Sequence, residues 1–486
     1  MRRLRLVTAL LVALAWVPGI IAAKGGLAPE FPAGLDWLNT PRPYTMQELR
    51  GKVVLLDFWT FACVNCMHVL PDLHRLELKY PGRLVVLGVH SAKFSGEQST
   101  QKIRSAVLRY QVTHPVLNDR ELKVWRLFDV HAWPTLVLIG PDGRIVKRHE
   151  GEGVFVAMDK AIAALLDGGK KAAKAAGTTP MPVKLEKVES KGLLRFPGKV
   201  LADAKSGRLF VADSGHDRVL VIDLKSGAVL KVLAQGLKDP QGMALSADGS
   251  RFYVASTGNH SVLEFVLGSG AQRLLADSLN SPWDLVAKDN KLYIAMAGDH
   301  QIWSLDPEDG EAQPYAGSGA EAILDGSLET AKLAQPSGLS QDAGHLYSAD
   351  SESSSIRRIS LGDPGAVETL VGKGLFDFGD VEGDRTQARL QHPLGVHFHG
   401  GLLYVADSYN NRIKIVDPDQ GGAQNFAGDG KAGLKDGAAS VARFDEPGGL
   451  WVADGKLYVA DTNNHAIRVL DLANGRTKTF RIQSGE

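Results

Sequence analysis

One stretch of the chain decides the fold of its first part: Phe58-Trp-Thr-Phe-Ala-Cys-Val-Asn-Cys-Met-His-Val-Leu-Pro-Asp-Leu-His74. Apolar side chains recur at helical spacing after its second cysteine, which predicts a helix over residues 66–79. Cys63 and Cys66 therefore lie at the start of a helix, where free N–H groups and the helix dipole stabilise a thiolate on Cys63. This arrangement predicts a redox pair: Cys63 attacks a disulfide of a partner, and Cys66 resolves the mixed disulfide.

Three other roles for a Cys-x-x-Cys pair each lack a required residue. A zinc site needs further ligands, and the chain contains only these two cysteines. Covalent haem attachment needs a histidine directly after Cys66, where the chain has Met67. A peroxidatic cysteine at position 63 would follow a proline at position 56, where the chain has Leu56. We therefore expect the pair to work without a metal or another cofactor.

The residues around this stretch predict an α/β domain. A nearly continuous apolar run leads into it and is typical of a strand buried on both faces of a sheet. Further strands and a helix follow, and the last predicted strands are joined by a turn at Pro141-Asp-Gly143. The predicted strands are residues 51–59, 84–89, 135–139 and 144–147, and the predicted second helix is residues 102–110.

Four features at ordered spacing resemble the thioredoxin-fold oxidoreductases: Asp57, Trp59, Pro71 and the tripeptide Trp133-Pro134-Thr135. The resemblance implies that Asp57 accepts and returns the proton of Cys66, and that Pro71 kinks the helix. It also implies that Trp59 and the tripeptide bind substrate, the tripeptide as a cis-proline loop. Two alternatives stay open. Trp59 and Trp133 could simply pack in the core, and Asp57 could be a buried carboxylate that relays no proton.

The N-terminus is predicted to be a secretory signal peptide over residues 1–23. Basic residues up to Arg5 precede an apolar run from Leu6 to Trp16, and small residues end at Ala23. We expect cleavage there and a periplasmic or otherwise extracytoplasmic protein. An uncleaved anchor is the alternative, because the apolar run approaches spanning length. Membrane contact is expected only in that case.

The composition limits the domains and the partners. Lys plus Arg and Asp plus Glu both number 55, so the chain lacks the net positive charge that drives nucleic-acid binding. Its 486 residues exceed one core of usual size, and its 53 glycines suit many short strands joined by turns. We expect a first domain over residues 24–165, a linker over 166–185 and a second domain over 186–486.

The second domain contains six copies of one pattern. The clearest copies begin at Leu209, Leu403 and Leu457, and each has two β-rich runs around a polar turn. A Pro-x-Gly-like element precedes every copy, at Pro197, Pro240, Pro282, Pro336, Pro393 and Pro447. Copies spaced by about 40 to 57 residues suit the blades of a six-bladed β-propeller.

Strand direction predicts which loops share a face of this propeller. In a four-stranded blade, the turn between the second and third strands lies on the same face as the crossover to the next blade. Long Gly-rich crossovers elaborate this face, at about residues 317–335, 372–392 and 428–446. We expect the face to bind a protein or glycan ligand. Four histidines fall in the turns and are expected to be turn residues rather than metal ligands: His216, His260, His300 and His465.

The whole pattern resembles the NHL repeat-containing protein 2 family. The resemblance rests on residues 58–74, on Gly88-Val-His-Ser-Ala-Lys-Phe94 and on residues 105–119, and it continues through the repeats. It implies a multidomain chain, with an α/β thioredoxin-like domain followed by an all-β six-bladed NHL-type β-propeller. Ala62 departs from the pattern, since relatives often have a cysteine there.

Two functions follow from these features. The first is a thiol–disulfide oxidoreductase whose propeller recruits a protein client carrying a disulfide or a dithiol. The second is a propeller-based binding or scaffold protein whose cysteine pair is redox-sensing or vestigial. Val64-Asn65 between the cysteines does not indicate the direction of electron flow, because the redox potential depends on the whole site.

Overall fold

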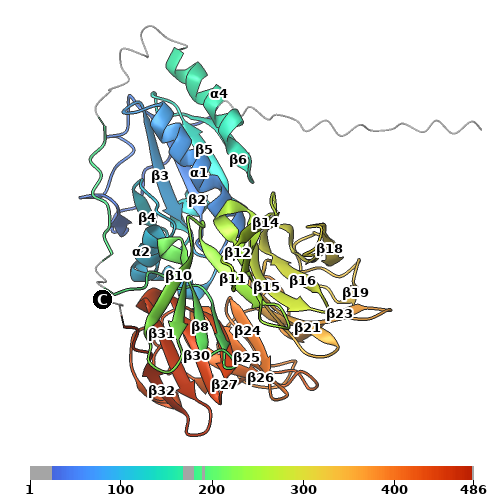
Figure 1. Cartoon of the computed structure of the whole chain (residues 1–486). Helices are drawn as coiled ribbons and strands as arrows, with labels where there is room; N and C mark the ends of the chain where they lie inside the picture. Colours follow the sequence, from blue (N-terminus) through green and yellow to red (C-terminus); the bar gives the residue numbers. More distant parts are fainter. Residues whose placement is uncertain (1–24, 168–179, 189–191, 484–486) are drawn as a thin grey trace, which may run out of the picture.

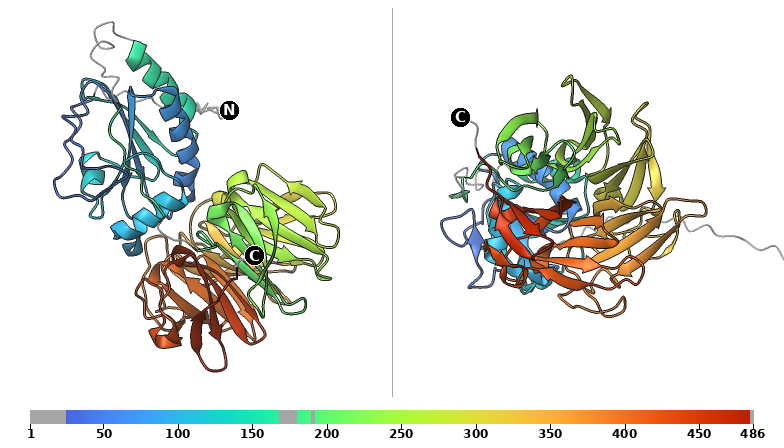
Figure 2. Two further views of the ribbon diagram at one scale, coloured as in Figure 1. Left: turned by 60° about the vertical axis from the view of Figure 1, so that its left-hand side comes forward. Right: turned by 60° about the horizontal axis from the view of Figure 1, so that its bottom comes forward.

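The chain forms an α/β domain that sits on one face of a β-propeller (Figure 1). The computed structural model describes residues 25–167, 180–188 and 192–483, so the predicted signal peptide lies outside the described residues. In Figure 2, one end of the α/β domain meets the propeller and the opposite end points away from it. Among the described residues, no helix combines the length and the apolar character needed to cross a bilayer.

The first domain is built on a six-stranded sheet with the order β1-β4-β3-β2-β5-β6. The three strands β2, β3 and β4 are parallel, and the other three pair in antiparallel fashion. Every residue of β2 and β3 is buried, which explains the continuous apolar runs in the sequence. The strands are β1 (Trp37–Leu38), β2 (Val53–Trp59), β3 (Leu84–His90), β4 (Val116–Asn118), β5 (Thr135–Ile139) and β6 (Ile145–Glu150).

Helices cover the sheet face that carries Leu55 and Trp59. Asp57 lies between these two residues on the same face, because side chains alternate along a strand. The covering helices are α1 (Val64–Lys79), α2 (Thr100–Arg109) and α4 (Val154–Asp167). The other face is covered by residues 28–49 and by the short helix α3 (Lys123–Leu127). A 3-10 turn, η1 (Ser95–Gln98), precedes α2.

The second domain is a six-bladed β-propeller, as predicted, and each blade is one contiguous stretch of chain. Blades one to three are β7–β10 (Val200–Asp203, Arg208–Asp213, Arg218–Asp223, Val229–Gln235), β11–β14 (Pro240–Leu245, Arg251–Ser256, Ser261–Val266, Gln272–Ala276) and β15–β18 (Pro282–Lys288, Lys291–Met296, Gln301–Leu305, Ala312–Ala316). Blade four is β20–β23 (Pro336–Gln341, His345–Asp350, Ser355–Ser360, Ala366–Val371), and blade five is β24–β27 (Gly395–His399, Leu402–Asp407, Arg412–Val416, Gln424–Ala427). Blade six is β29–β32 (Pro447–Ala453, Lys456–Asp461, Ala466–Asp471, Arg476–Thr479). Blades four and six each gain a short outer strand, β19 (Gly326–Ser327) and β28 (Gly437–Ala438).

The ring of blades closes by direct contact between the last blade and the first. The hydroxyl of Thr462 donates a hydrogen bond to the carbonyl of Pro197 at 2.9 Å. The C-terminal segment reaches back to the first blade, where the amide of Gln483 donates to Gly227 at 2.8 Å and its carbonyl accepts from Val229 at 3.2 Å. These bonds join segments from opposite ends of the propeller sequence.

The turns and crossovers share one face of the propeller, as the strand directions predict. Two asparagine side chains in the turns donate to crossover carbonyls: Asn410 to Gly379 at 2.8 Å, and Asn464 to Gly433 at 2.9 Å. Five of the turns form short 3-10 helices, η2 (Ser214–His216), η3 (Thr257–Asn259), η4 (Ala297–Asp299), η5 (Ser408–Asn410) and η7 (Thr462–Asn464). A further one, η6 (Ala439–Val441), lies in the last crossover.

The predicted linker, residues 166–185, overlaps chain that belongs with the first domain. Helix α4 ends inside it, and residues 168–179 lie outside the described residues. Residues 180–188 then run along the first domain, where the backbone amide of Glu186 donates to the side-chain oxygen of Asn39 at 2.9 Å. The chain therefore follows the α/β domain before it enters the propeller.

Candidate active site

The two cysteines lie at the N-terminus of α1. Cys63 is the N-cap residue, and its Sγ accepts a hydrogen bond from the backbone amide of Cys66 at 3.2 Å. The helix therefore begins at Val64, two residues before its predicted start. Cys63 is 9% exposed and Cys66 is fully buried. Burial raises the pKa of the Cys66 thiol well above its ordinary value, and the neighbouring Cys63 and Asp57 add to that effect.

Asp57 is a buried carboxylate in the middle of β2. It has no exposed surface, and neither of its oxygens has a hydrogen-bond partner among the described residues. Burial raises its pKa to about 7, and the nearby His114 opposes that effect. A carboxylate with this pKa can hold or give up a proton near neutral pH.

The predicted cis-proline loop has the expected backbone. The Trp133–Pro134 peptide is cis, and Thr135 begins β5, where it pairs with Phe58 of β2. The indole nitrogen of Trp133 donates to the carbonyl of Ser91 at 2.9 Å. Trp133 also packs against the apolar cluster that contains both cysteines. The structure therefore brings this loop and the cysteine pair together.

Trp59 and Thr135 are both buried and do not reach the surface. Trp59 has no exposed surface, and its ring packs edge-on against His90 with centroids 5.1 Å apart. The hydroxyl of Thr135 donates to the carbonyl of Ala132 at 2.7 Å. Trp59 packs in the apolar cluster that contains both cysteines, and Thr135 holds the cis-proline loop. A substrate-binding role for these two side chains stays a prediction.

Glu97 contacts the residues that precede Cys63, and no sequence motif indicates it. Its buried carboxylate accepts the backbone amides of Ala62 at 2.9 Å, Phe94 at 3.0 Å and Lys93 at 3.1 Å, and the hydroxyl of Thr60. Burial raises its pKa to about 7, against these hydrogen bonds. Glu97 thus fixes the loop that leads into Cys63.

Six propeller residues occupy equivalent positions at the face that meets this loop. Each directly precedes a repeat proline and has a positive φ, which turns the chain into the innermost strand of its blade. We call them the pre-proline ring: Phe196, Asp239, Ser281, Gln335, His392 and Glu446. The ring surrounds the propeller axis, because the innermost strands of adjacent blades pack side by side around it.

Repeat residues hold the ring in place from two sides. A buried aspartate accepts the amide of the residue two positions before the repeat proline, at 2.7 or 2.8 Å, in four blades: Asp213, Asp350, Asp407 and Asp461. The last turn residue of one blade accepts the amide of the ring residue of the next. These pairs are Asp217 with Asp239, His300 with Gln335, Ser354 with His392, Asn411 with Glu446 and His465 with Phe196, at 3.0 to 3.2 Å.

Two of the four turn histidines, His300 and His465, are thus hydrogen-bond acceptors for the ring. His216 contacts Asp213 at 2.9 Å, and His260 contacts the carbonyl of Leu279 at 3.1 Å. In the part of the chain that the structure describes, no group of three or more His, Cys, Asp or Glu side chains is placed to hold a metal ion.

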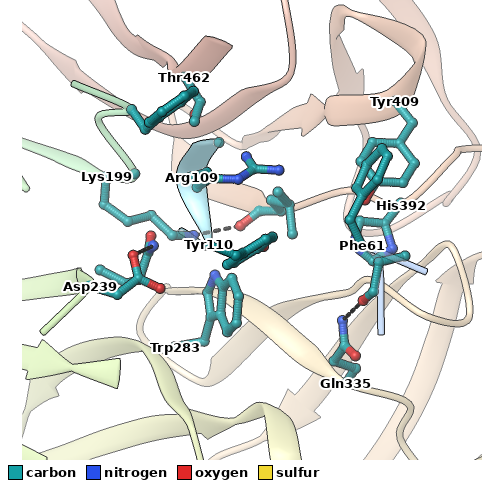
Figure 3. Close-up of a pocket in the computed structure, with 16 residues that line it drawn as sticks. Phe61, Arg109, Tyr110, Lys199, Asp239, Trp283, Gln335, His392, Tyr409 and Thr462 are labelled. Atoms are coloured by element: carbon teal, nitrogen blue, oxygen red, sulfur yellow. Dashed lines mark hydrogen bonds between the residues drawn. The ribbon is translucent and has the colours of Figure 1, made fainter. Parts of the chain in front are cut away.

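Gln335 of the ring binds the backbone on both sides of Cys63. Its Oε1 accepts the amide of Val64 at 2.8 Å, and its Nε2 donates to the carbonyl of Ala62 at 2.8 Å. Figure 3 shows this side chain directed at the active-site loop beside Phe61. A side-chain amide that pairs with a backbone N–H and C=O makes the same two bonds as a neighbouring peptide strand.

Buried ion pairs fasten the two domains around this contact. Lys93 of the first domain pairs with Glu352 of the propeller at 2.5 Å. Glu446 of the ring forms ion pairs with Arg109 at 3.2 Å and with Lys102 at 3.7 Å. The carboxylate side chains are at most 9% exposed, so these pairs are shielded from solvent.

Aromatic packing completes the contact. Tyr409, on a propeller turn, lies with its ring centroid 5.5 Å from Phe61 and 5.8 Å from Phe94. Beside it, Gln391 accepts the amide of Gly96 at 2.7 Å. The elaborated face of the propeller therefore carries the active-site end of the first domain.

Two of the cavities between the domains reach the residues on either side of Cys63. A cavity of about 40 Å³ at the propeller axis lies between Phe61 and Tyr110 of the first domain and Asp239 and Trp283 of the propeller (Figure 3). A larger cleft of about 530 Å³ separates α1 from the first three blades, and its lining includes Met67, Pro71, His114, Asp239 and Trp283. The cleft begins next to the cysteine pair, since Val64 also lines it.

Fold and site together define a thioredoxin-like domain with a Cys-x-x-Cys pair, fused to an NHL-repeat β-propeller. The sequence profile described as Thioredoxin-like matches residues 51–145, and the NHL repeat profile matches residues 444–470. NHL repeat-containing protein 2 of Bos taurus is 41% identical over 95% of this chain and 72% of its own length. The chain belongs to the NHL repeat-containing protein 2 family.

Two other relatives show how far the similarity extends. Protein SUPPRESSOR OF QUENCHING 1, chloroplastic, of Arabidopsis thaliana is 42% identical over 92% of this chain. The matched region spans 47% of that protein, about half of its length. The thiol-disulfide oxidoreductase ResA of Halalkalibacterium halodurans is 30% identical over 22% of this chain and 58% of its own length.

Proposed function

We propose that this protein is a thiol–disulfide oxidoreductase whose propeller controls which protein clients reach Cys63. One arrangement carries the proposal: Cys63 caps a helix, and the buried thiol of Cys66 lies close enough to the buried carboxylate of Asp57 for the two groups to interact electrostatically. In this proposal Cys63 attacks from the helix N-terminus, and the carboxylate of Asp57 accepts the proton that Cys66 releases. The partial similarity to a thiol-disulfide oxidoreductase supports the same chemistry.

The reaction has two balanced steps. The Cys63 thiolate attacks one sulfur of the client disulfide, so that a Cys63–client bond forms and the other client sulfur leaves as a thiolate. Cys66 then gives its proton to Asp57 and attacks Cys63 Sγ. The Cys63–Cys66 disulfide forms, and the second client sulfur leaves as a thiolate. The client gains two electrons and the protein loses two; the reverse sequence oxidises a dithiol client.

The propeller supplies selectivity in this proposal. Gln335 holds the backbone on both sides of Cys63, and the cysteine is only 9% exposed. A client must therefore replace these contacts or enter through the cleft beside α1. A protein or glycan ligand on the elaborated face would share that face with the thioredoxin-like domain.

A binding or scaffold function is the second candidate, and the burial of Cys63 favours it. In that case the domain contact is permanent and the cysteine pair senses redox state or is vestigial. The two candidates differ in whether Cys63 reacts with a client disulfide while the chain is intact.

Trapping a client distinguishes the two candidates. The full-length Cys66→Ser variant retains the attacking thiol and lacks the resolving one, so a disulfide-bearing test peptide should accumulate as a stable adduct on Cys63. The Cys63→Ser variant should form no adduct and should leave the peptide oxidised. Equal reduction of the peptide by wild type and Cys63→Ser would rule out the oxidoreductase.

Export is part of the same proposal and rests on the leader-like residues 1–23. A mature protein that begins near residue 24 and fractionates outside the cytoplasm is expected. N-terminal sequencing of the purified protein from its native cell tests this, and an intact Met1 on a cytoplasmic protein would contradict it.

A further inference from the structure

Four buried polar atoms without hydrogen-bond partners gather behind the cysteine pair. They are both carboxylate oxygens of Asp57, Nε1 of Trp59 and Nε2 of His114, and none has a partner among the described residues. Gly88 is the cross-strand partner of Asp57 in the parallel pair of β2 and β3. A Cβ at Gly88 would lie 2.9 Å from Trp59 Nε1 and 3.4 Å from His114 Nε2. The two ring nitrogens therefore converge on the space beside Asp57.

These four buried atoms destabilise the folded protein unless they share a proton or a bridging water. A buried polar atom that makes no hydrogen bond destabilises the folded protein, because it has lost its hydrogen bonds to water. Asp57 and Trp59 lie on the same face of β2, and Gly88 offers no side chain to separate them from His114. The arrangement therefore joins an acid, a donor and an imidazole in one enclosed space.

His114 also reaches the cleft between the domains. It lies two residues before β4, its side chain is 3% exposed, and it lines the cleft of about 530 Å³. Its Nδ1 lies 3.7 Å from Oε2 of Glu77, which is 26% exposed on α1 and lines the same cleft. An imidazole that carries its proton on Nδ1, the nitrogen that faces Glu77, offers Nε2 as an acceptor on the buried side.

We propose that His114 shares the proton of Asp57 and passes it to Glu77 and the cleft, so that Asp57 is ionised when Cys66 must be deprotonated. This inference rests on the proposed oxidoreductase function. His114 acts through Asp57 and does not touch the reacting sulfurs, so it is a positioning residue for the second step.

The proton path is balanced. A protonated Asp57 gives its proton to Nε2 of His114, directly or through one water, and Nδ1 releases its own proton toward Glu77 and the cleft. The ionised Asp57 then takes the thiol proton of Cys66. The groups that face Asp57 in this path are His114, before β4, and Cys66 of α1, and Glu77 of α1 faces the outer side of His114.

The test follows the two thiol steps separately in the full-length protein, with dithiobis(nitrobenzoate) as the probe. The first coloured thiolate reports attack by Cys63, and the second reports resolution by Cys66. In His114→Gln the first release should keep its wild-type rate. The second release should be about tenfold slower at pH 6 and equal to wild type at pH 9, where Asp57 is ionised in both proteins.

Two further variants separate a relay from a packing defect. His114→Ala should show the same slow second release at pH 6, and added imidazole should restore it through the cleft. His74→Ala is the matched control, because His74 is an exposed histidine of α1 that lines the same cleft. It should change neither release.

The outcomes are distinguishable. A wild-type second release at pH 6 in both His114 variants would overturn the relay and leave the oxidoreductase intact. A second release that is equally slow at pH 6 and pH 9, and that imidazole does not restore, would show a packing defect and also overturn it. A wild-type protein that releases no thiolate at all would contradict the proposed function itself.

Discussion

Gln335, at the end of a propeller crossover, accepts a hydrogen bond from the backbone amide of Val64, the residue next to Cys63, at 2.8 Å. The two residues are 271 positions apart in the chain. A second bond from the same side chain holds the carbonyl of Ala62. The loop that contains Cys63 thus faces a residue of the chain's own propeller.

Loss of the Gln335 side chain should make Cys63 more accessible. Gln335→Ala should raise the rate at which a bulky maleimide labels Cys63, measured in a Cys66→Ser background. Two neutral hydrogen bonds contribute about 1 kcal/mol each, so an increase of about tenfold or more is expected. Gln341→Ala is the control, because Gln341 makes its bond to Ala287 inside the propeller. Equal labelling of both variants would show that Gln335 does not restrict access.

Asp57→Asn should stabilise the protein more at pH 8 than at pH 5. Burial raises the pKa of Asp57 from 3.8 to about 7, so between these values the folded protein holds a proton that the unfolded chain has released. Stability therefore falls as the pH rises through this range, by up to about 4 kcal/mol for a shift of this size. Thermal unfolding at both pH values measures the difference. A gain that is the same at pH 5 and pH 8 would mean that the Asp57 carboxylate is not the cause.

Glu97→Gln should have the opposite effect on stability, although burial also raises the pKa of Glu97 to about 7. The carboxylate accepts backbone amides from Ala62, Lys93 and Phe94, and a glutamine would turn an N–H donor toward some of them. We expect a loss of about 2 kcal/mol or more and faster hydrogen exchange over residues 60–62. Unchanged hydrogen exchange over residues 60–62 would show that Glu97 does not hold the loop that precedes Cys63.

Glu446→Gln should loosen the contact between the domains. It leaves two buried cations, Lys102 and Arg109, without their carboxylate, which typically costs about 3–5 kcal/mol. Solution scattering should show that the two domains move apart, and protease should cleave more readily at residues 180–188, which run along the first domain. Glu368→Gln is the control: it breaks a pair with Arg358 in which Glu368 is 47% exposed, and should cost less than about 1 kcal/mol. The prediction fails if both variants keep the wild-type scattering profile.

Much of the candidate site could be predicted, because its chemistry lies close together in the sequence. Cys63, Cys66 and Asp57 fall within one strand–turn–helix unit, whose geometry follows from the apolar run of β2 and the helical spacing of α1. The cis peptide before Pro134 likewise follows from a short motif. Glu97 could not be predicted, because it acts through backbone amides, and backbone amides leave no pattern in a sequence.

In the propeller, too, the sequence predicts some features and not others. The repeats predicted six blades, and strand direction predicted which face carries the turns and crossovers. The pre-proline ring occupies a position that the repeats define, directly before Pro336 and its equivalents. No repeat rule indicates that Gln335 and Glu446 at this position contact the other domain, because the residues of the ring differ from blade to blade.

By itself the sequence determined the two folds, their order and the place of the cysteine pair at the start of a helix, since short-range periodicity and spacing control strands and helices. Only the tertiary structure decided what Cys63 faces. Contacts such as Gln335 with Val64, Glu352 with Lys93 and Glu446 with Arg109 join surfaces far apart in the chain. Their stability depends on shape and charge complementarity between two folded domains, and this complementarity exists only after both have folded.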